Sequence, residues 1–261
     1  METREGTLMA VYYITIYERI DGVPRFECTE YCGKTKEYVV LIPVIDGGAC
    51  LINELKRASD CHVSDYADMV ICDEGTKYTS SQEAILRNLG VNSLLLKRDV
   101  GKQGAKLRMG LWWALDRGYK GIITIDGNNM NSIEGVPKFI YKLAEGYDFV
   151  QGSRFINGRK RIAIHTSIIS MMAHYKFTDA TNTFRAYSSQ FLCDKRVQPF
   201  REIFATDELL TYLPVKAAQI GLRVCEIPVD RVNVDEKEKC RWAILLKNMI
   251  GIYNPDFNRR R

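Results

Sequence analysis

Short, continuous apolar runs alternate with longer amphipathic stretches along most of the chain, from Tyr38 onward. Short apolar runs are typical of strands buried on both faces, whereas apolar positions three and four residues apart are typical of helices. The pattern predicts strands at 38–45, 68–72, 92–97, 121–125 and 148–151. It predicts helices between them, at 51–58, 81–89, 102–116 and 135–145. This alternation favours βαβ units, and therefore a largely parallel sheet covered by helices on both faces.

The two ends of the chain differ from this regular part. An apolar, Tyr-rich run at 8–17 precedes a polar turn around Asp21, which predicts an added strand or hairpin. Near the other end, 242–253 has apolar residues at helical spacing and is followed by a basic tail. We therefore expect an N-terminal extension at 1–37, a main domain at 38–239, and an amphipathic helix with a basic tail at 240–261.

Length and composition fit a single domain, because 261 residues that are 46% apolar can bury one sizeable core. The longest stretch without Asp, Glu, Lys or Arg, at 162–175, is shorter than the roughly 20 apolar residues that cross a bilayer. The N-terminus also lacks the pattern of a secretory signal. We expect a cytoplasmic protein, and peripheral binding at the inner face of a membrane stays open.

The net charge of +5, from 37 basic and 32 acidic residues, is too small to indicate a nucleic-acid partner, and we expect none. The basic residues are clustered, however, at 154–161, 237–241 and 259–261. Such clusters suit phosphate groups or an anionic membrane surface, and a solvated basic face is the alternative.

Acidic residues follow several of the predicted strands. Asp46 comes after the first strand, Asp73 and Glu74 after the second, and Asp126 after the fourth. Because the carboxyl ends of parallel strands meet at one edge of a sheet, these carboxylates would lie close together and repel. A divalent metal that bridges phosphate oxygens would relieve this repulsion. A turn or helix-cap role explains each acid by itself, so the prediction of a site depends on their joint order.

Eight segments in order carry a resemblance to a known family: VVLIPVIDGG, ICDEGTKYTS, GKQGAKLRMG, IDGNNMN, VQGSRF, DATNTFRAYS, ATDELLTY and EIPVDRVNVDEK. Together they resemble the motifs of family 2 glycosyltransferases, most closely the polyprenyl-phosphate enzymes of the dolichol-phosphate mannosyltransferase type. In IDGNNMN, Asp126 and Asn128 stand where the family carries Asp-X-Asp, so an amide replaces the second carboxylate.

The resemblance implies a GT-A fold, an α/β single domain with a mostly parallel central sheet flanked by helices. It makes 38–239 a catalytic domain, that of a hexosyltransferase. The implied reaction moves a sugar from a nucleoside-diphosphate sugar, with inversion, to a polyprenyl phosphate or another acceptor. The implied cofactor is a divalent cation, Mg²⁺ or Mn²⁺, and the implied partners are the nucleotide-sugar donor and a polyprenyl-phosphate lipid or membrane surface.

The resemblance also assigns roles to residues. For donor and nucleotide binding they are Pro43, Val44, Asp46, Asp73, Glu74, Lys102, Asp126, Gly127 and Asn128. For the metal they are Asp126 and Asn128. For acceptor or phosphate binding they are Ser153, Arg154, Arg185, Arg231 and Lys237. For catalysis they are Asp126, Asp207, Glu208, Arg231 and Lys237. Asp207 or Glu208 would take the proton of a hydroxyl acceptor, and helix capping is the alternative for both.

Three other functions compete with this hypothesis. One is a glycosyltransferase with a soluble hydroxyl acceptor. Another is a sugar nucleotidyltransferase, but its Gly-rich basic loop is missing, since DGGACLINE after the first strand has no cation. The third is a non-catalytic protein that binds a nucleotide sugar, which Asn128 favours. The amphipathic run at 162–175 could lie on a membrane or face the core, and the pattern does not decide between them.

Overall fold

The computed structural model describes residues 13–20, 22–44, 49–75, 77–99, 104–156, 164–204 and 206–230. In these ranges the strands are β1 (Tyr13–Tyr17), β2 (Phe26–Glu30), β3 (Tyr38–Pro43), β4 (Asp68–Glu74), β5 (Val91–Lys97), β6 (Gly121–Thr124), β7 (Phe149–Ser153), β8 (Arg185–Ser188) and β9 (Val224–Pro228). The α-helices are α1 (Ala49–Asp60), α2 (Ser80–Asn88), α3 (Gly104–Asp116), α4 (Val136–Ala144), α5 (Ile164–Ala173), α6 (Ser189–Cys193) and α7 (Glu208–Gln219).

One sheet holds all the strands of the described ranges, in the order β1-β2-β5-β4-β3-β6-β8-β7-β9. β3, β4, β5 and β6 pair in parallel, and β9 pairs in parallel with β7. Among the described strands, only β2 and β8 run against the direction of the others. The predicted α/β fold, with a central sheet of mostly one strand direction between helices, is confirmed.

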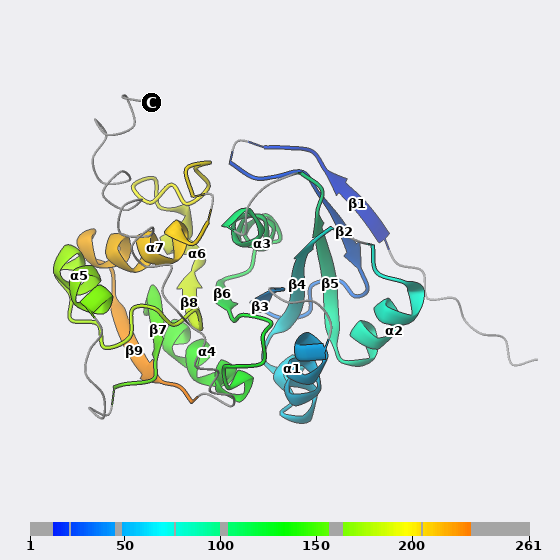
Figure 1. The fold of residues 1–261 in the computed structure, drawn as a ribbon, viewed down its shortest axis with the longest axis horizontal. Coiled ribbons are helices and arrows are strands. Elements are labelled where there is room, and N and C mark those ends of the chain that lie inside the picture. Colours follow the sequence, from blue (N-terminus) through cyan, green and yellow to red (C-terminus); the bar gives the residue numbers. More distant parts are fainter. Residues whose placement is uncertain are drawn as a thin grey trace, which may run out of the picture.

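Helices cover both faces of the sheet (Figure 1). Alternate residues of β3 point to opposite faces, so Val39 and Leu41 pack in one core while Val40 and Ile42 pack in the other. The first core includes residues of α3, α5, α6 and α7, and the second includes residues of α1, α2 and α4. Burial on both faces explains why these strands are continuous apolar runs in the sequence.

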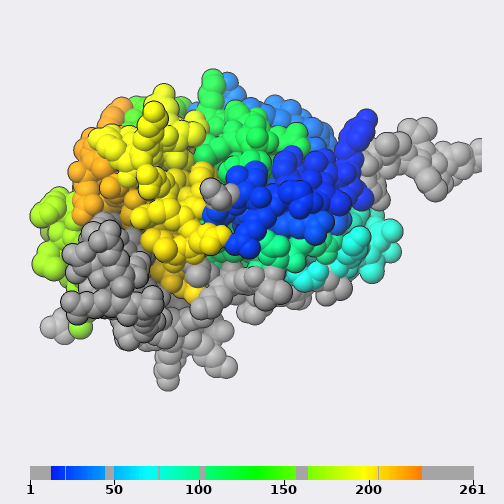
Figure 2. All heavy atoms as spheres, turned by 90° about the horizontal axis from the view of Figure 1, so that it is seen from above, coloured from blue at the N-terminus to red at the C-terminus, as the bar shows by residue number. Residues whose placement is uncertain are grey.

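The N-terminal segment forms an antiparallel hairpin of β1 and β2, whose second strand pairs with β5. The hairpin turn contacts the segment before α7, because Arg19 forms an ion pair with Glu202 and Gly22 lies against the main chain of Phe200. Figure 2 shows the two segments in contact, in blue and yellow. Because β2 pairs with β5, the hairpin extends the main sheet.

Strand β8 was not expected from the sequence pattern. Its four residues, RAYS, contain no apolar run, yet β8 lies between β6 and β7 and runs antiparallel to both. The strand brings the segment before Arg185 to the sheet edge where β6 and β7 end. This edge is the one where the sequence predicts the site.

Two predicted segments lie outside the described residues: the first twelve residues of the N-terminal extension, and the helix and tail at 240–261. Within the described ranges, no helix is both long and apolar enough to cross a membrane.

Helix α3 lies very close to the sheet at Gly110. A Cβ atom at this position would lie 2.7 Å from Cys72 Sγ and 3.0 Å from Leu41 Cδ1. We predict that Gly110→Ala lowers the free energy of unfolding by about 1–3 kcal/mol through overpacking. Gly33→Ala is the control, since nothing lies within 4 Å of its added Cβ. Urea denaturation measures both, and equal stabilities of the two variants would contradict the prediction.

Candidate active site

The loop after β6 is held against the end of β3. The main-chain N–H of Gly127 donates to the carbonyl of Pro43 at 3.0 Å. A Cβ at Gly127 would lie 3.3 Å from that carbonyl oxygen and 3.1 Å from Ile42 Cγ2. Glycine thus permits the close approach that brings these two predicted donor residues together.

Asp126 and Asn128 lie on this loop. The hydroxyl of Thr183 donates to Asp126 Oδ2 at 2.7 Å, and the main-chain N–H of Met130 donates to Asn128 Oδ1 at 3.1 Å. Thr183 comes from the segment before β8, so that strand joins the DATNTFRAYS motif to the IDGNNMN motif. Thr183 is not among the site residues predicted from the sequence.

The residues at this loop fit a hard divalent cation. Within the described ranges, no three His, Cys, Asp or Glu side chains gather to hold a metal by themselves. Mg²⁺ is commonly held by one or two carboxylates together with substrate phosphates, and its ligands are oxygens. The carboxylate of Asp126 and the amide oxygen of Asn128 are oxygens of that kind, and a diphosphate would supply others.

The end of β4 carries Asp73 and Glu74. Asp73 accepts hydrogen bonds from the hydroxyl of Tyr78 at 2.7 Å and from the main-chain N–H of Glu74 at 2.8 Å. Burial raises the pKa of Tyr78, and the bond to Asp73 raises this pKa further, so the phenol stays protonated and donates. The Asp73 carboxylate is therefore held in place by its own turn.

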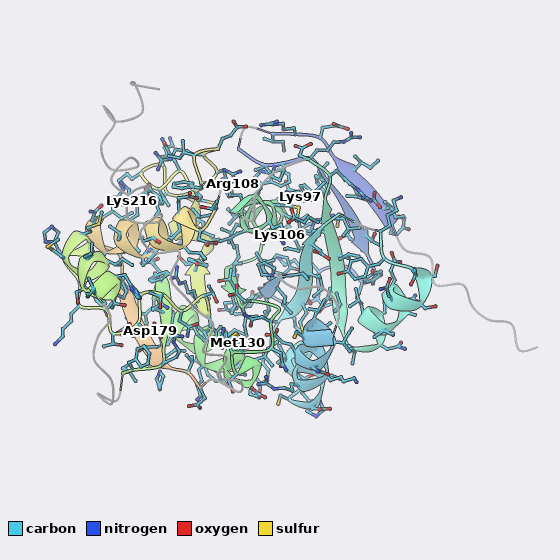
Figure 3. The ribbon with its side chains drawn as sticks, viewed as in Figure 1. Lys97, Lys106, Arg108, Met130, Asp179 and Lys216 are labelled. Carbon is cyan, nitrogen blue, oxygen red and sulfur yellow. The ribbon has the colours of Figure 1, made fainter. Side chains whose placement is uncertain are left out.

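Glu74 pairs with two buried lysines that the sequence analysis missed. Its carboxylate lies 2.6 Å from Lys97 Nζ and 3.5 Å from Lys106 Nζ, and these side chains are only 1% and 4% exposed. Figure 3 shows both lysines in the middle of the molecule. Burial alone would raise the pKa of Glu74, but the two ammonium groups lower it below its ordinary value. Lys106 Nζ also donates to the carbonyl of Val44 at 2.6 Å, which links α3, β3 and β4.

At the end of β7, both predicted residues have protein partners. Ser153 shares a 2.5 Å hydrogen bond with Thr178. Arg154 binds the fully buried carboxylate of Asp179 through two nitrogens, at 2.6 and 2.9 Å, and also donates to Thr181. Asp179 thus balances the charge of Arg154 and fixes its direction.

Arg185 lies in the interior and is bonded to the main chain. The residue is 1% exposed, and each of its three guanidinium nitrogens donates to a main-chain carbonyl, those of Asn182, Leu210 and Ala180. These bonds tie β8 to α7. The motif that suggested phosphate binding therefore places Arg185 in the interior, where it supports the loop that carries Thr183.

The start of α7 separates the two predicted catalytic acids. Glu208 is buried and accepts from the main-chain N–H and the hydroxyl of Thr206, at 2.5 and 2.6 Å. Asp207 is the N-cap residue, but its side chain makes no capping hydrogen bond to the helix, and it is partly exposed. Of the pair, Asp207 is the more exposed. Asp46, Lys102, Arg231 and Lys237 lie outside the described residues.

One further acid beside the site is not among the residues predicted from the sequence, because its helix has an ordinary amphipathic pattern. Glu54 lies on α1 and is 0% exposed. Its Oε2 atom accepts from the main-chain N–H of Asn129 at 3.1 Å. Burial, with a contribution from the charge of Asp126, raises the pKa of Glu54 to about 8. Its place between Leu51 and Leu55, on the apolar face of α1, is the signal that could have revealed it.

Curated proteins and solved structures resemble the chain. No family model matches the chain. An undecaprenyl-phosphate 4-deoxy-4-formamido-L-arabinose transferase of Edwardsiella ictaluri is 26% identical over 243 residues, which cover 83% of this chain and 67% of that protein. An uncharacterized protein of Methanocaldococcus jannaschii is 25% identical over 233 residues, which cover 82% of this chain and 95% of the relative.

Among solved structures, glucosyl-3-phosphoglycerate synthase from Mycobacterium tuberculosis, in complex with Mn²⁺, UDP and phosphoglyceric acid, aligns with a TM-score of 0.59. The alignment covers 84% of this chain and 77% of that one at 15% identity. The chain therefore shares the fold of this synthase. The structural and sequence relatives agree with the resemblance to family 2 glycosyltransferases and with the prediction of a glycosyltransferase.

The raised pKa of Glu54 predicts a pH effect on stability. Between the ordinary value of 4.5 and the folded value of about 8, the folded protein keeps a proton that the unfolded chain releases. The free energy of unfolding should therefore fall as the pH rises through this window. Glu54→Gln should make this fall shallower, while Glu18→Gln, on an exposed residue, should not. Urea denaturation across the window measures the slopes, and a wild-type slope in Glu54→Gln would contradict the prediction.

Proposed function

We propose that this glycosyltransferase moves a sugar from a nucleoside-diphosphate sugar to a polyprenyl phosphate, with inversion at the anomeric carbon. The contact network around the ends of β3, β4 and β6 carries the proposal. Gly127 bonds to Pro43, and Lys106 joins Val44 to Glu74. Residues that the resemblance assigns to one donor nucleotide, although far apart in the sequence, are thus in direct contact or share a partner.

In the proposed complex, the two ends of the donor occupy different parts of this edge. Asp73 and Glu74 contact the base or ribose beside Pro43 and Val44, with Asp46 and Lys102 as further donor contacts. Asp126 and Asn128 hold a divalent cation together with the diphosphate. That cation, when bound, neutralises the charge that builds up on the leaving diphosphate. The Mn²⁺ and UDP in the structure of the mycobacterial synthase support this arrangement.

The transfer itself needs no base when the acceptor is a phosphate. A phosphate oxygen of the lipid forms the new bond to the anomeric carbon as the bond to the nucleoside diphosphate breaks, so one displacement inverts the centre. The protein's role is to align the two groups and to balance their charges. Arg154, directed by Asp179, with Ser153, Arg231 and Lys237, supplies polar groups for the phosphates. The name of the Edwardsiella relative supports a lipid-phosphate acceptor.

A hydroxyl acceptor is the second candidate, and the position of Asp207 favours it. The partly exposed Asp207 carboxylate stands at the start of α7, where it could accept the proton that a hydroxyl loses. Glu208 would then position the start of α7 through Thr206.

A membrane-bound acceptor requires a protein surface that contacts the bilayer, and the exposed face of α5 has the apolar residues for such a contact. Its inner face buries Thr166, Ile169 and Ala173, and the helix packs against α7. Its outer face leaves Ile164 79% and Met171 69% exposed, seven residues apart and therefore on one side of the helix. The helix lies at one end of the molecule, on the left in Figure 1. The basic residues at 159–161 precede it in the sequence, which suits an anionic bilayer. These features support the proposal of a cytoplasmic protein that binds peripherally at the inner face of a membrane.

Asp126→Ala tests the donor site. We expect GDP-, UDP-, CDP- or dTDP-sugars with Mn²⁺ to raise the melting temperature of the wild type, and the matching donor to release its diphosphate when polyprenyl phosphate is added. Asp126→Ala should lose the shift and about 100-fold or more of the turnover. Asp116→Ala, on an exposed acid, should retain both.

The outcomes separate the candidate functions. A shift without turnover on any acceptor would support a non-catalytic binding protein. Turnover only on hydroxyl acceptors, lost in Asp207→Asn, would support the second candidate. Absence of a shift with every donor would overturn the proposed function.

The outer face of α5 predicts membrane binding. Liposomes that contain anionic lipid should bind the wild type more strongly at low salt than at high salt. The double variant Ile164→Glu with Met171→Glu should bind at least about tenfold more weakly, because it removes two apolar contacts and adds repulsion. Ile85→Glu, on the exposed Ile85 of α2, is the control and should bind as the wild type does. Equal binding of all three proteins in a sedimentation assay would contradict a role for α5.

A further inference from the structure

Glu54 is an acid on the apolar face of a helix. The same face of α1 buries Leu51, Leu55 and Ala58, and Glu54 is as fully buried as Leu55. An unpaired carboxylate in such a place is strongly destabilising, and even a protonated one needs hydrogen-bond partners. Core packing alone would favour leucine at this position, so the acid calls for another explanation.

The explanation lies in the loop after β6, which α1 holds at several points. Glu54 Oε2 accepts from the main-chain N–H of Asn129 at 3.1 Å. Three residues further along the same helix, Arg57 donates to Asn129 Oδ1 at 2.9 Å and to the carbonyl of Asn131 at 3.4 Å. Arg57 also forms an ion pair with Glu134. Glu54 and Arg57, on adjacent turns of α1, therefore hold Asn129 through its main chain and its side chain, and we call this pair the clamp.

The backbone of Asn129 is in the left-handed region, with φ of 56°. Asparagine tolerates this conformation better than most residues with a Cβ, and the contacts from α1 hold it there. The main chain of Asn128, directly before it, donates to the carbonyl of Asp126 at 2.8 Å. The turn that displays Asp126 and Asn128 is thus continuous with the clamped residue.

The clamp is also not optimised for stability. Within the described residues, Glu54 Oε1 and Asn131 Oδ1 are buried side-chain oxygens without a hydrogen-bond partner. Buried oxygens in this state lower stability, and such costs concentrate at functional sites.

We propose that Glu54 is a positioning residue for the diphosphate and metal loop: through Asn129, and together with Arg57, it fixes the turn from which Asp126 and Asn128 reach the cation. This inference rests on the proposed function, because it concerns the same donor site. Glu54 touches neither substrate nor metal in it. Its effect passes through the main chain of the loop.

The proposal predicts which property changes. Without an acceptor at position 54, the N–H of Asn129 loses its buried partner and the left-handed turn relaxes. Asp126 and Asn128 then shift together, so binding of the cation with the nucleotide weakens. Groups that support metal ligands from outside typically contribute about 10- to 100-fold to metal affinity.

Four variants test the role of Glu54. Glu54→Leu has a similar volume and no acceptor, whereas Glu54→Gln keeps a carbonyl oxygen for Asn129. Arg57→Met removes the second half of the clamp at a residue that is only partly buried. Lys56→Ala, on an exposed residue of the same helix, is the control. Mn²⁺ binding is measured by electron paramagnetic resonance with the nucleoside diphosphate that the donor screen identifies, and kcat and KM are measured alongside.

We expect Glu54→Leu to weaken Mn²⁺ binding about 10- to 100-fold and Arg57→Met to weaken it in the same direction. Glu54→Gln should stay within about threefold of the wild type, and Lys56→Ala should be unchanged.

Wild-type Mn²⁺ binding in a folded Glu54→Leu protein would overturn the inference. If Glu54→Leu does not fold, Arg57→Met decides by the same criterion. If the wild type and the variants all bind nucleotide and Mn²⁺ equally well, only this inference is overturned. A wild type that binds neither overturns the proposed function, and this inference with it.

Discussion

The donor side of the site depends on how closely α3 approaches the sheet. Gly110 leaves no side chain between the helix and Leu41 or Cys72, so the start of α3 reaches the ends of β3 and β4. At that distance Lys106 can donate to Val44 while it lies beside Glu74. A buried ammonium needs such partners, and therefore the same contact that stabilises Lys106 fixes the position of the two strand ends. A bulkier residue at 110 would move the helix outward and separate these groups.

The edge of the sheet gathers acidic side chains that a stable core would avoid, and several of them have a polar or charged partner beside them. Asp73 has Tyr78, Glu74 has two lysines, and Asp179 has Arg154. This pairing holds the side chains rigid before a ligand arrives, which reduces the ordering cost of binding. The edge thus forms a prearranged frame around Asp126, and α5 and the hairpin turn lie outside it.

The sequence predicted the frame of the fold because burial on both faces makes strands such as β3 and β4 continuous apolar runs. Because parallel strands end at one edge of a sheet, Asp73 and Asp126 could be assigned to the same edge from the strand order alone. The pairings within that edge were not predictable, since Thr183 meets Asp126 only through the short strand β8, which has no apolar pattern. Arg185 shows the converse limit. A motif placed it near the acceptor, whereas its three main-chain bonds place it in the interior. Lysines and glutamates on apolar faces escape pattern analysis because it assigns charged residues to solvent.

The presence of Glu54 gives the amide at position 128 a physical context. Asp126 and Glu54 are close enough that the charge of Asp126 raises the pKa of Glu54. A carboxylate at position 128, on the same turn, would add a third acid to this pair and increase the repulsion within the loop. Asn128 keeps an oxygen toward the site without that charge, and its Oδ1 also accepts from Met130 to close the turn. The residue at position 128 and Glu54 therefore contribute to the same electrostatic balance around Asp126. A substitution at either position has to be interpreted with the other.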